Sequence, residues 1–570
     1  MSPQLAAQTL TGSATVEVQV DAGPVTEELD ALRDRLDEAE REREELRRLL
    51  GTLGAPPDPP PGNSPETPPG TPPGTPPDLS AGTPADAVSP PTYGSDGFTP
   101  ITPSADSRVV YVSSSRGSDR NHGLSPDAPL RSVYAGYRRL RHGFPDHLLF
   151  FAGDTFAENL GKIDKSGRSA QEPMVFGVYV DPQKPDLPRP IFFSPGESWA
   201  FKDFRANGSH LVFRGLHLMA PHRDARRPGF NPLALTPEQW KHSGLRFLGD
   251  AQNITVEDCV LELFKFGLVF QSDPDHGLMR NIRLHRVVVA DSFGHWDKKI
   301  AGHSSGLYAQ YIDGLAITDS VFDHNGWNTM VQGAGKTKFN HNLYIQKDCQ
   351  NVAVRRSIMA RGASHGLQLR SGGVVEDCLF VGNALAFYVA RRPSVVKDNV
   401  VMHSADLGEG KADRRGHGIE TLPVQSAEIT GNIISQKGGT ADFAPAIGIT
   451  WAKGAGRWLD GRPYRVTLVG NRVHAWPRYE GRESAIDITG AAEVQDNRDN
   501  QVDRASGGTF DAAQWREPGR DVAGYAATLG LDASLEAFLM RARQRPRGLW
   551  DDRFAAPGVN AYIREGFTAR

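Results

Sequence analysis

Long hydrophobic runs are missing from this sequence of 570 residues. The strongest short run covers residues 148–152, well below the roughly 20 residues that a membrane-spanning helix needs, so we expect no membrane span. Residues 1–10 contain no basic stretch followed by an apolar one, and we therefore expect no cleavable signal peptide.

The sequence also lacks an excess of basic residues, and it contains few cysteines. The 64 Lys and Arg residues are balanced by 68 Asp and Glu residues, and this net charge of −4 gives no electrostatic footprint for nucleic acid. The three cysteines are expected to be buried thiols and not a disulfide framework. The abundant residues are 60 Gly and 41 Pro, which fit a turn-rich β protein with an unstructured linker.

One short pattern returns nine times between residues 244 and 489. Each copy places a small or turn-prone residue before a strand that alternates apolar and variable positions, the period-two signature of a half-buried strand. The copies are residues 243–247, 266–270, 305–309, 341–345, 365–369, 385–389, 417–421, 445–449 and 484–488. A second strand precedes each copy, as in residues 253–259 and 351–357.

A small polar residue recurs at one turn of each repeat. These residues are Cys259, Ser320, Ser357, Cys378, Asn399, Asn432, Asn471 and Asn497. We expect their side chains to bond to one another between neighbouring repeats. The shortest repeat, from Leu367 to Phe387, is too short for two helices, so the pattern predicts a stacked β-solenoid. On these strands and turns, residues 108–502 resemble the right-handed parallel β-helix proteins of the pectate-lyase-like type.

The resemblance implies an all-β fold, and the composition divides the chain into five segments. These are a short attachment segment (1–24), a coiled-coil helix (25–50), a Pro/Gly-rich linker (51–104), the parallel β-helix (105–504) and a helical C-terminal cap or accessory region (505–570). An amphipathic segment with Val133, Tyr137 and Leu140 is expected to plug the first coil, because the end coils of a solenoid expose apolar core and free strand edges.

The segment before the linker carries a heptad repeat. Leu29, Leu36 and Leu50 take a positions together with Arg43, and the flanks are rich in Glu and Arg. Within it, residues 35–40 resemble a short motif of trimeric coiled coils. We therefore expect a homotrimer.

The outward positions of the recurring strands form one polar strip, because successive coils lie about 4.8 Å apart. Three groups contribute to it. The outward positions are Tyr308, Tyr344, Gln368, Tyr388, Glu420, Gly448 and Asp487; two residues further lie Gln310, Gln346 and Arg370; and His341, His365 and His417 precede the small residues.

The longest loops all enter just before the recurring strand, the side on which repeat proteins tend to carry their binding face. We expect these loops to wall a groove with Trp296, Trp327 and Trp476 in addition to the tyrosines of the strip. Aromatic faces beside polar groups suit a sugar chain.

An oligomerising helix, a long linker and a β-helix in this order resemble bacteriophage tailspikes. Tailspikes are typically homotrimers that bind a surface polysaccharide and often cleave it. The resemblance implies a bacterial surface polysaccharide as partner, attachment to a virion tail through the N-terminus, and a location on the virion tail or outside the cell. An exported bacterial polysaccharide lyase and a spike that only binds glycan are the alternatives.

Two chemistries compete if the protein is an enzyme. Elimination from an acidic glycan would use His365 as base, Arg370 with Gln346 or Gln368 to neutralise the carboxylate, and Tyr344 as acid, with His341 in the same cluster. Inverting hydrolysis would use Glu420 and Asp487, two coils and roughly 9–10 Å apart. We expect no cofactor, and the sequence leaves a divalent cation such as calcium open.

Overall fold

The computed structural model describes most of the chain from Tyr93 onward. The described residues are 93–95, 97–158, 161–194, 208–407, 416–436, 438, 444–450, 458–459, 461–477, 484–488 and 492–570. They all belong to one compact unit, residues 81–570. The expected attachment segment (1–24), the coiled coil (25–50) and the linker up to residue 92 lie outside the described residues.

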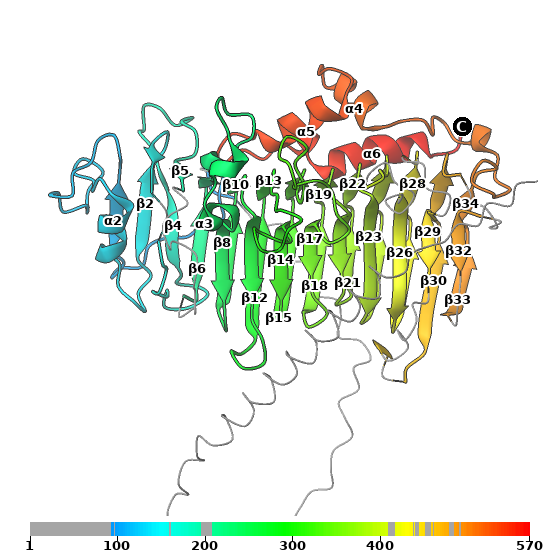
Figure 1. Ribbon diagram of the computed structural model, residues 1–570, viewed down its shortest axis with the longest axis horizontal. Coiled ribbons are helices and arrows are strands. Elements are labelled where there is room, and N and C mark those ends of the chain that lie inside the picture. Colours follow the sequence, from blue (N-terminus) through cyan, green and yellow to red (C-terminus); the bar gives the residue numbers. More distant parts are fainter. Residues whose placement is uncertain are drawn as a thin grey trace, which may run out of the picture. The chain divides into compact units, whose positions relative to one another are not determined.

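Three long sheets form the body of this unit (Figure 1). The 13-stranded sheet contains β1 (Val109–Val112), β2 (His147–Phe151), β4 (Met174–Tyr179), β6 (Leu211–Arg214), β9 (Gln252–Glu257), β12 (Met279–His285), β15 (Ile312–Thr318), β18 (Gln350–Arg355), β21 (Gly373–Glu376), β24 (Ser394–Lys397), β27 (Ser426–Thr430), β30 (Tyr464–Val469) and β33 (Ala492–Arg498). The 12-stranded sheet contains β3 (Thr155–Phe156), β5 (Ile191–Phe193), β7 (His217–Met219), β10 (Val260–Glu262), β13 (Val288–Ala290), β16 (Val321–Asp323), β19 (Ile358–Ala360), β22 (Leu379–Val381), β25 (Val400–Met402), β28 (Ile433–Ser435), β31 (Arg472–His474) and β34 (Gln501–Val502). The nine-stranded sheet contains β8 (Ser243–Leu248), β11 (Phe266–Gln271), β14 (Ser305–Gln310), β17 (His341–Ile345), β20 (His365–Leu369), β23 (Leu385–Arg391), β26 (His417–Val424), β29 (Ile447–Ile449) and β32 (Ile486–Ile488).

The strands repeat in one order along the chain, and neighbouring coils pair in parallel, as in β9 with β12, β10 with β13, and β11 with β14. The expected parallel β-helix is therefore confirmed. The nine recurring copies are the nine strands of one sheet, in the predicted register. Leu307 pairs with Leu343, Leu343 with Leu367, and Leu367 with Phe387, and all four side chains are fully buried.

The corner between the 13-stranded and 12-stranded sheets explains the column of small polar residues. Nδ2 of Asn399 donates to Oδ1 of Asn432 at 2.9 Å, and Nδ2 of Asn432 donates to Oδ1 of Asn471 at 2.9 Å. Each of these asparagines follows a residue in the left-handed region, such as Gly431 with φ 64° or Gly470 with φ 66°. This ladder confirms bonding between coils.

The last member of the predicted column was wrong. Asn471 donates to Oδ1 of Asn500 at 2.8 Å, and Asn500 follows Asp499, whose φ is 57°. The pairing of β30 with β33 shifts register between Val466 and Thr467. The shift adds one residue to β33, and the column continues at Asn500 and not at Asn497.

Both ends of the described unit pack on the solenoid. Helix α2 (Val133–Arg139) lies against the first coil, and its Val133 and the following Leu140 enter the main core. Phe98 is only 3% exposed, and Thr99 donates to Oε1 of Glu257 through its N–H at 3.0 Å and its Oγ1 at 2.8 Å. The end of the predicted linker is therefore a packed anchor and not a spacer.

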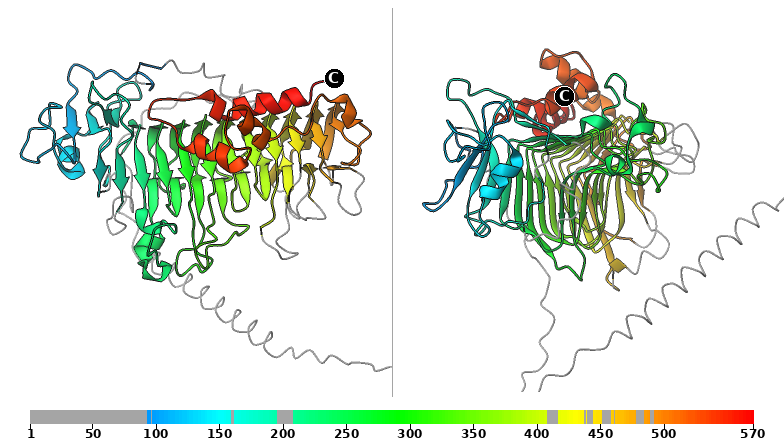
Figure 2. Two further views of the ribbon diagram at one scale, coloured as in Figure 1. Left: turned by 90° about the horizontal axis from the view of Figure 1, so that it is seen from above. Right: turned by 60° about the vertical axis from the view of Figure 1, so that its left-hand side comes forward.

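The C-terminal region is helical, as expected, but it lies along the solenoid and not over its last coil (Figure 2). Its helices are α4 (Val522–Thr528), α5 (Leu535–Arg543) and α6 (Ala556–Gly566). Phe538, Val559 and Ile563 pack against the 12-stranded sheet in one core cluster that includes Val288 and Ile358. The helices thus cover a sheet face that is apolar over many coils.

The remaining described helix, α3 (Pro237–Trp240), and four 3-10 turns lie in connections: Pro221–Arg223, Pro232–Ala234, Ala512–Gln514 and Asp552–Phe554. Within the described ranges, no helix is long and apolar enough to cross a membrane. All three cysteines are free and buried, as the sequence predicts.

Candidate functional site

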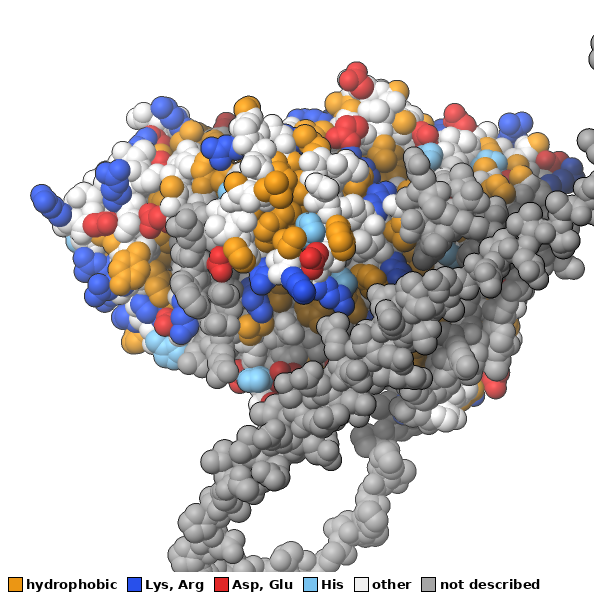
Figure 3. Space-filling model, in the orientation of Figure 1, with side chains coloured by type: hydrophobic (Ala, Val, Ile, Leu, Met, Phe, Trp, Pro, Cys, Tyr) orange, Lys and Arg blue, Asp and Glu red, His pale blue; other side chains and the backbone are white. Residues whose placement is uncertain are grey.

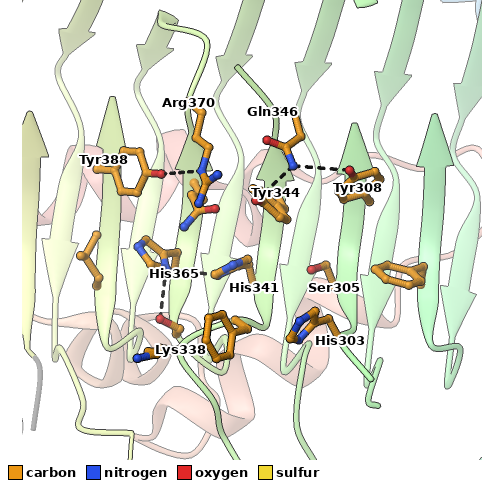
Figure 4. A pocket seen from close by; sticks show the side chains of 15 residues that line it. His303, Ser305, Tyr308, Lys338, His341, Tyr344, Gln346, His365, Arg370 and Tyr388 are labelled. Carbon is orange, nitrogen blue, oxygen red and sulfur yellow. Dashed lines mark hydrogen bonds between the residues drawn. The ribbon is translucent and has the colours of Figure 1, made fainter. Parts of the chain in front are cut away.

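A cleft of about 650 Å³ opens on the outer face of the nine-stranded sheet, across β11, β14, β17, β20 and β23. Fifteen residues line it: Phe266, His303, Ser305, Tyr308, Lys338, Phe339, His341, Tyr344, Gln346, Ser364, His365, Gln368, Arg370, Leu385 and Tyr388. They are arranged in tiers (Figure 4), with Arg370 and Gln346 at one edge, the two central histidines in the middle, and Lys338 and His303 at the other edge.

The strand register brings the central side chains together. Tyr308 pairs with Tyr344, Tyr344 with Gln368, and Gln368 with Tyr388, so four consecutive coils place one outward side chain each in a single row. Alternation sends the neighbouring leucines into the core and these side chains out. The cleft therefore contains Tyr308, His341, Tyr344, Gln346, His365, Gln368, Arg370 and Tyr388 from the predicted strip.

One cleft tyrosine already donates its hydroxyl proton to a hydrogen bond within the protein. Oη of Tyr308 donates to Oε1 of Gln310 at 2.8 Å. Nε2 of Gln346 donates to Oη of Tyr308 at 3.4 Å and to Oη of Tyr344 at 3.1 Å. Tyr344 thus accepts a hydrogen bond, and among the described residues its own hydroxyl proton has no acceptor. Its phenol can donate that proton to a ligand.

Arg370 lies between two tyrosines. Its Nε donates to Oη of Tyr388 at 2.9 Å, and its guanidinium carbon lies 5.1 Å from the centre of the Tyr344 ring. Burial raises the pKa of Tyr388 to about 12, although the Arg370 charge opposes the shift. Tyr388 therefore stays protonated and holds the guanidinium over the cleft as a fixed cation.

Two imidazoles meet in the middle of the cleft. Nδ1 of His365 lies 3.1 Å from Nδ1 of His341 and 3.0 Å from Oγ of Ser364. His341 is only 2% exposed, and burial, followed by the nearby His365, Arg370 and His303, holds its pKa well below the usual value. His341 is therefore neutral at ordinary pH, and His365 is the more accessible of the two rings.

The charged side chains that line the cleft among the described residues have one sign. They are Arg370 and Lys338, beside three histidines, and this described lining includes no Asp or Glu. Burial and the neighbouring Lys298 and Lys265 lower the pKa of His303, which places two more cations at this edge. Lys and Arg side chains gather beside hydrophobic and histidine side chains on this face (Figure 3). The cleft suits an anionic ligand.

Four predicted site residues do not line the cleft. Gln310 lies next to the cleft, where its Oε1 accepts a hydrogen bond from the cleft residue Tyr308. Trp327 donates its Nε1 to the carbonyl of Arg361 at 2.8 Å and packs on His324. Glu420 and Asp487 follow Tyr388 along the row, separated by Gly448, so the carboxylates are two coils apart as predicted but outside the cleft.

Two of the tryptophans expected in the groove wall do not lie there. Trp476 is fully buried and donates its Nε1 to the carbonyl of Ala444 at 2.7 Å, so its place in the wall was wrong. Trp296 is exposed and stacks on His295, but it does not line the cleft. Trp476 is buried because its large apolar surface is more stable away from water.

Sequence reasoning missed seven lining residues. Phe266, Ser305 and Leu385 occupy the strand position that His341 and His365 also occupy, so the register contained a signal for them. Ser364 precedes this position by one residue. His303, Lys338 and Phe339 come from the loops before β14 and β17, whose paths no periodicity specifies.

Three parallel sheets and an outward cleft lined by cationic side chains define a parallel β-helix protein. No family model matches the chain, and no curated protein is similar to it. Solved structures are similar in fold: pectate lyase Pel9A (14% identity over 76% of this chain and 87% of that chain, TM-score 0.39), a rhamnogalacturonan lyase (12%, 73% and 93%, 0.33) and XylC in complex with xylose (8%, 78% and 81%, 0.37). At these identities the likeness concerns the fold alone.

Within the described residues, no group of three or more His, Cys, Asp or Glu side chains is arranged to hold a metal ion.

Proposed function

We propose that the protein binds an acidic bacterial surface polysaccharide in this cleft and cleaves it by β-elimination. One observation carries the proposal: an imidazole, a guanidinium and phenols with available protons line a single cleft, in which the described residues place no carboxylate. Elimination from a uronic acid needs a base, a group that neutralises the carboxylate and an acid, and these side chains can supply all three.

The reaction assigns one role to each group. Neutral His365 removes the proton next to the sugar carboxylate, and that electron pair forms the carbon–carbon double bond as the bond to the glycosidic oxygen breaks. Arg370 neutralises the carboxylate while negative charge develops on it. Tyr344 protonates the departing oxygen with its hydroxyl proton, which has no acceptor among the described residues. Water then returns the proton from His365 to Tyr344.

Other cleft residues bind and orient the substrate. The Gln368 side chain is only 6% exposed, and its Oε1 has no hydrogen-bond partner among the described residues, so it can accept from a sugar hydroxyl. Lys338 offers a second cation at the opposite edge of the cleft. An uncharged glycan would leave Lys338 and Arg370 without anionic partners, which favours an acidic polymer.

The arrangement of the whole chain supports a tailspike-like depolymerase. The heptads of residues 25–50 favour a homotrimer, and the Pro-rich linker separates this segment from the solenoid. In this proposal the N-terminus attaches to a virion tail, and the cleft meets the glycan outside the cell. A cation such as calcium is not needed in the proposed reaction, because Arg370 neutralises the carboxylate.

The test is incubation of the full chain with a panel of capsular and uronic-acid polysaccharides. Elimination produces ultraviolet absorbance from the new double bond together with reducing ends, whereas hydrolysis produces reducing ends alone. We expect both signals, unchanged by a chelator. His365→Ala and Arg370→Ala should each lower the rate at least about a hundredfold.

Exposed residues of the same types provide the controls. His276 and Arg280 are exposed and lie outside the cleft, so His276→Ala and Arg280→Ala should leave the rate unchanged. Reducing ends without absorbance, lost in Glu420→Gln or Asp487→Asn, would transfer the chemistry to the hydrolase pair. Burial raises the pKa of Glu420, as a general acid requires, although a hydrogen bond from Thr450 opposes the shift. Binding without turnover would leave a spike that only binds glycan.

A further inference from the structure

The contact between His341 and His365 restricts where their protons lie. The two Nδ1 atoms are 3.1 Å apart. Two neutral imidazoles keep such a contact when one Nδ1 carries a hydrogen and the other a lone pair. The pair therefore has two arrangements, and only one of them leaves the lone pair of His365 on Nε2.

Burial decides between the arrangements when the pair takes up a proton. His341 is 2% exposed, and its ring packs edge-on against Tyr344, with 5.1 Å between ring centres. Charge on this ring would be desolvated and would face Arg370 and His303. The proton therefore goes to His365. Because Nδ1 of His365 already faces His341 and Ser364, the proton arrives at Nε2.

We propose that His341 is a positioning residue that accepts the Nδ1–H hydrogen bond of His365 and so keeps the lone pair of His365 on Nε2, towards the substrate. This inference rests on the proposed lyase function. In other histidine bases a carboxylate commonly takes this position. Here an imidazole takes it, and Oγ of Ser364 lies 3.0 Å from the same nitrogen of His365.

An imidazole orients the base without adding negative charge. No Asp or Glu is among the described residues of the cleft lining, and the proposed substrate is anionic. A carboxylate behind His365 would repel the substrate carboxylate and would raise the pKa of the base. Neutral His341 avoids both effects.

The described groups beside the pair agree with this assignment. They are Tyr344 on β17, Ser364 and Arg370 beside β20, Tyr388 on β23, and His303 and Lys338 from the loops. After burial, the nearby His365, Arg370 and His303 each disfavour a proton on His341.

Three substitutions at one position test the role. His341→Phe keeps the ring but removes the acceptor, and we expect kcat to fall about a hundredfold with little change in KM. His341→Asn restores an acceptor through its amide oxygen and should recover kcat to within about tenfold of the original chain. Equal losses in both variants would reduce His341 to a packing residue and overturn the proposal.

His341→Asp separates orientation from charge. The carboxylate can accept the same hydrogen bond, so kcat at high pH should resemble that of His341→Asn. Its charge should raise KM for an acidic polysaccharide about tenfold and move the rise of kcat to higher pH, because the imidazolium is stabilised. An unchanged pH profile and KM would contradict the role of charge.

The tautomer can be measured without any turnover. In the full chain with 15N-labelled histidine, we expect His365 to carry its hydrogen on Nδ1, and His341→Phe should abolish this preference. His222→Phe is the matched control, because His222 stacks on His242 in a second, half-buried pair outside the cleft. Hydrogen on Nε2 of His365 would overturn the positioning role even in an active enzyme. The expected tautomer in a chain that cleaves no acidic glycan would overturn the lyase function alone.

Discussion

Among single residues, the three cleft tyrosines differ in where their protons go. Tyr308 donates to Gln310, whereas the protons of Tyr344 and Tyr388 have no acceptor among the described residues. Tyr388 is held by Arg370 and has a pKa raised to about 12 by burial. The committed proton sets Tyr308 apart, and burial beside Arg370 sets Tyr388 apart, so Tyr344 is the candidate acid.

This difference gives a prediction with a built-in comparison. Tyr344→Phe removes the proposed acid and should lower kcat at least about a hundredfold for polysaccharide cleavage. Tyr308→Phe removes a hydroxyl whose proton is already committed, so we expect a loss of less than about tenfold. Initial rates at saturating substrate measure both. A larger loss in Tyr308→Phe than in Tyr344→Phe would reassign the acid.

Among elements, helix α5 is tied to the 12-stranded sheet by buried ion pairs. Arg543 contacts Glu262 at 3.2 Å, Asp291 at 2.5 Å and Asp323 at 3.2 Å. Burial alone would raise the pKa of Asp291, but hydrogen bonds and charge from His324 and Arg543 outweigh it and hold that pKa well below its usual value. The helix thus neutralises a column of acids that three successive strands place at one corner.

Removal of this arginine should be costly at neutral pH. Arg543→Met leaves three carboxylates without their shared cation, and we expect the free energy of unfolding to fall by about 3–5 kcal/mol in urea titrations at pH 7. Because the folded pKa of Asp291 is depressed, its stabilisation is present above the unfolded value of about 4 and is lost as pH falls through the folded pKa. The difference in unfolding free energy between the original chain and Arg543→Met should therefore be smaller at pH 3 than at pH 7.

The control for this prediction lies on the same helix. Arg541 is exposed, and Arg541→Met should change stability by less than about 1 kcal/mol. If the loss of unfolding free energy in Arg543→Met stays constant from pH 7 to pH 3, lost packing and not charge explains the effect.

For the whole molecule, the structure moves the start of the folded unit. Tyr93 Oη lies 2.7 Å from Nε2 of His285, and Phe98 is buried. A chain that starts at Ala105 should still fold, because each coil is stabilised by its neighbours. We expect it to be about 2–4 kcal/mol less stable than a chain that starts at Tyr93, since it loses the burial of Phe98 and the bonds of Thr99 to Glu257.

Urea unfolding of the two truncated chains measures this difference. Phe98→Ala in the longer chain should reproduce most of it. Equal stability of the two chains would show that the anchor contributes nothing and would restore the boundary at residue 105.

Assembly is the second prediction for the whole molecule. The heptads of residues 25–50 and the motif at residues 35–40 favour three helices in parallel, although Arg43 occupies a core position. Light scattering at micromolar concentration should give the mass of a trimer for the full chain and of a monomer once residues 1–50 are removed. A monomeric full chain would disprove the coiled coil.

The sequence by itself determined the solenoid and the row of outward residues. Strand alternation has a period of two, so Leu343 and Leu367 had to face inward if Tyr344 and Gln368 faced outward. Stacked coils then placed Tyr308, Tyr344 and Gln368 side by side. These conclusions follow from local patterns, because each coil repeats the geometry of the one before it.

Only the tertiary structure decided which part of that row is a site and how the ends are packed. The loops that carry His303 and Lys338 have no period, so nothing in the sequence placed them over β14 and β17 and away from Glu420. The contact between the His341 and His365 rings and the path of α5 depend on side-chain packing between distant segments. Such contacts are set by long-range packing, which periodicity does not encode.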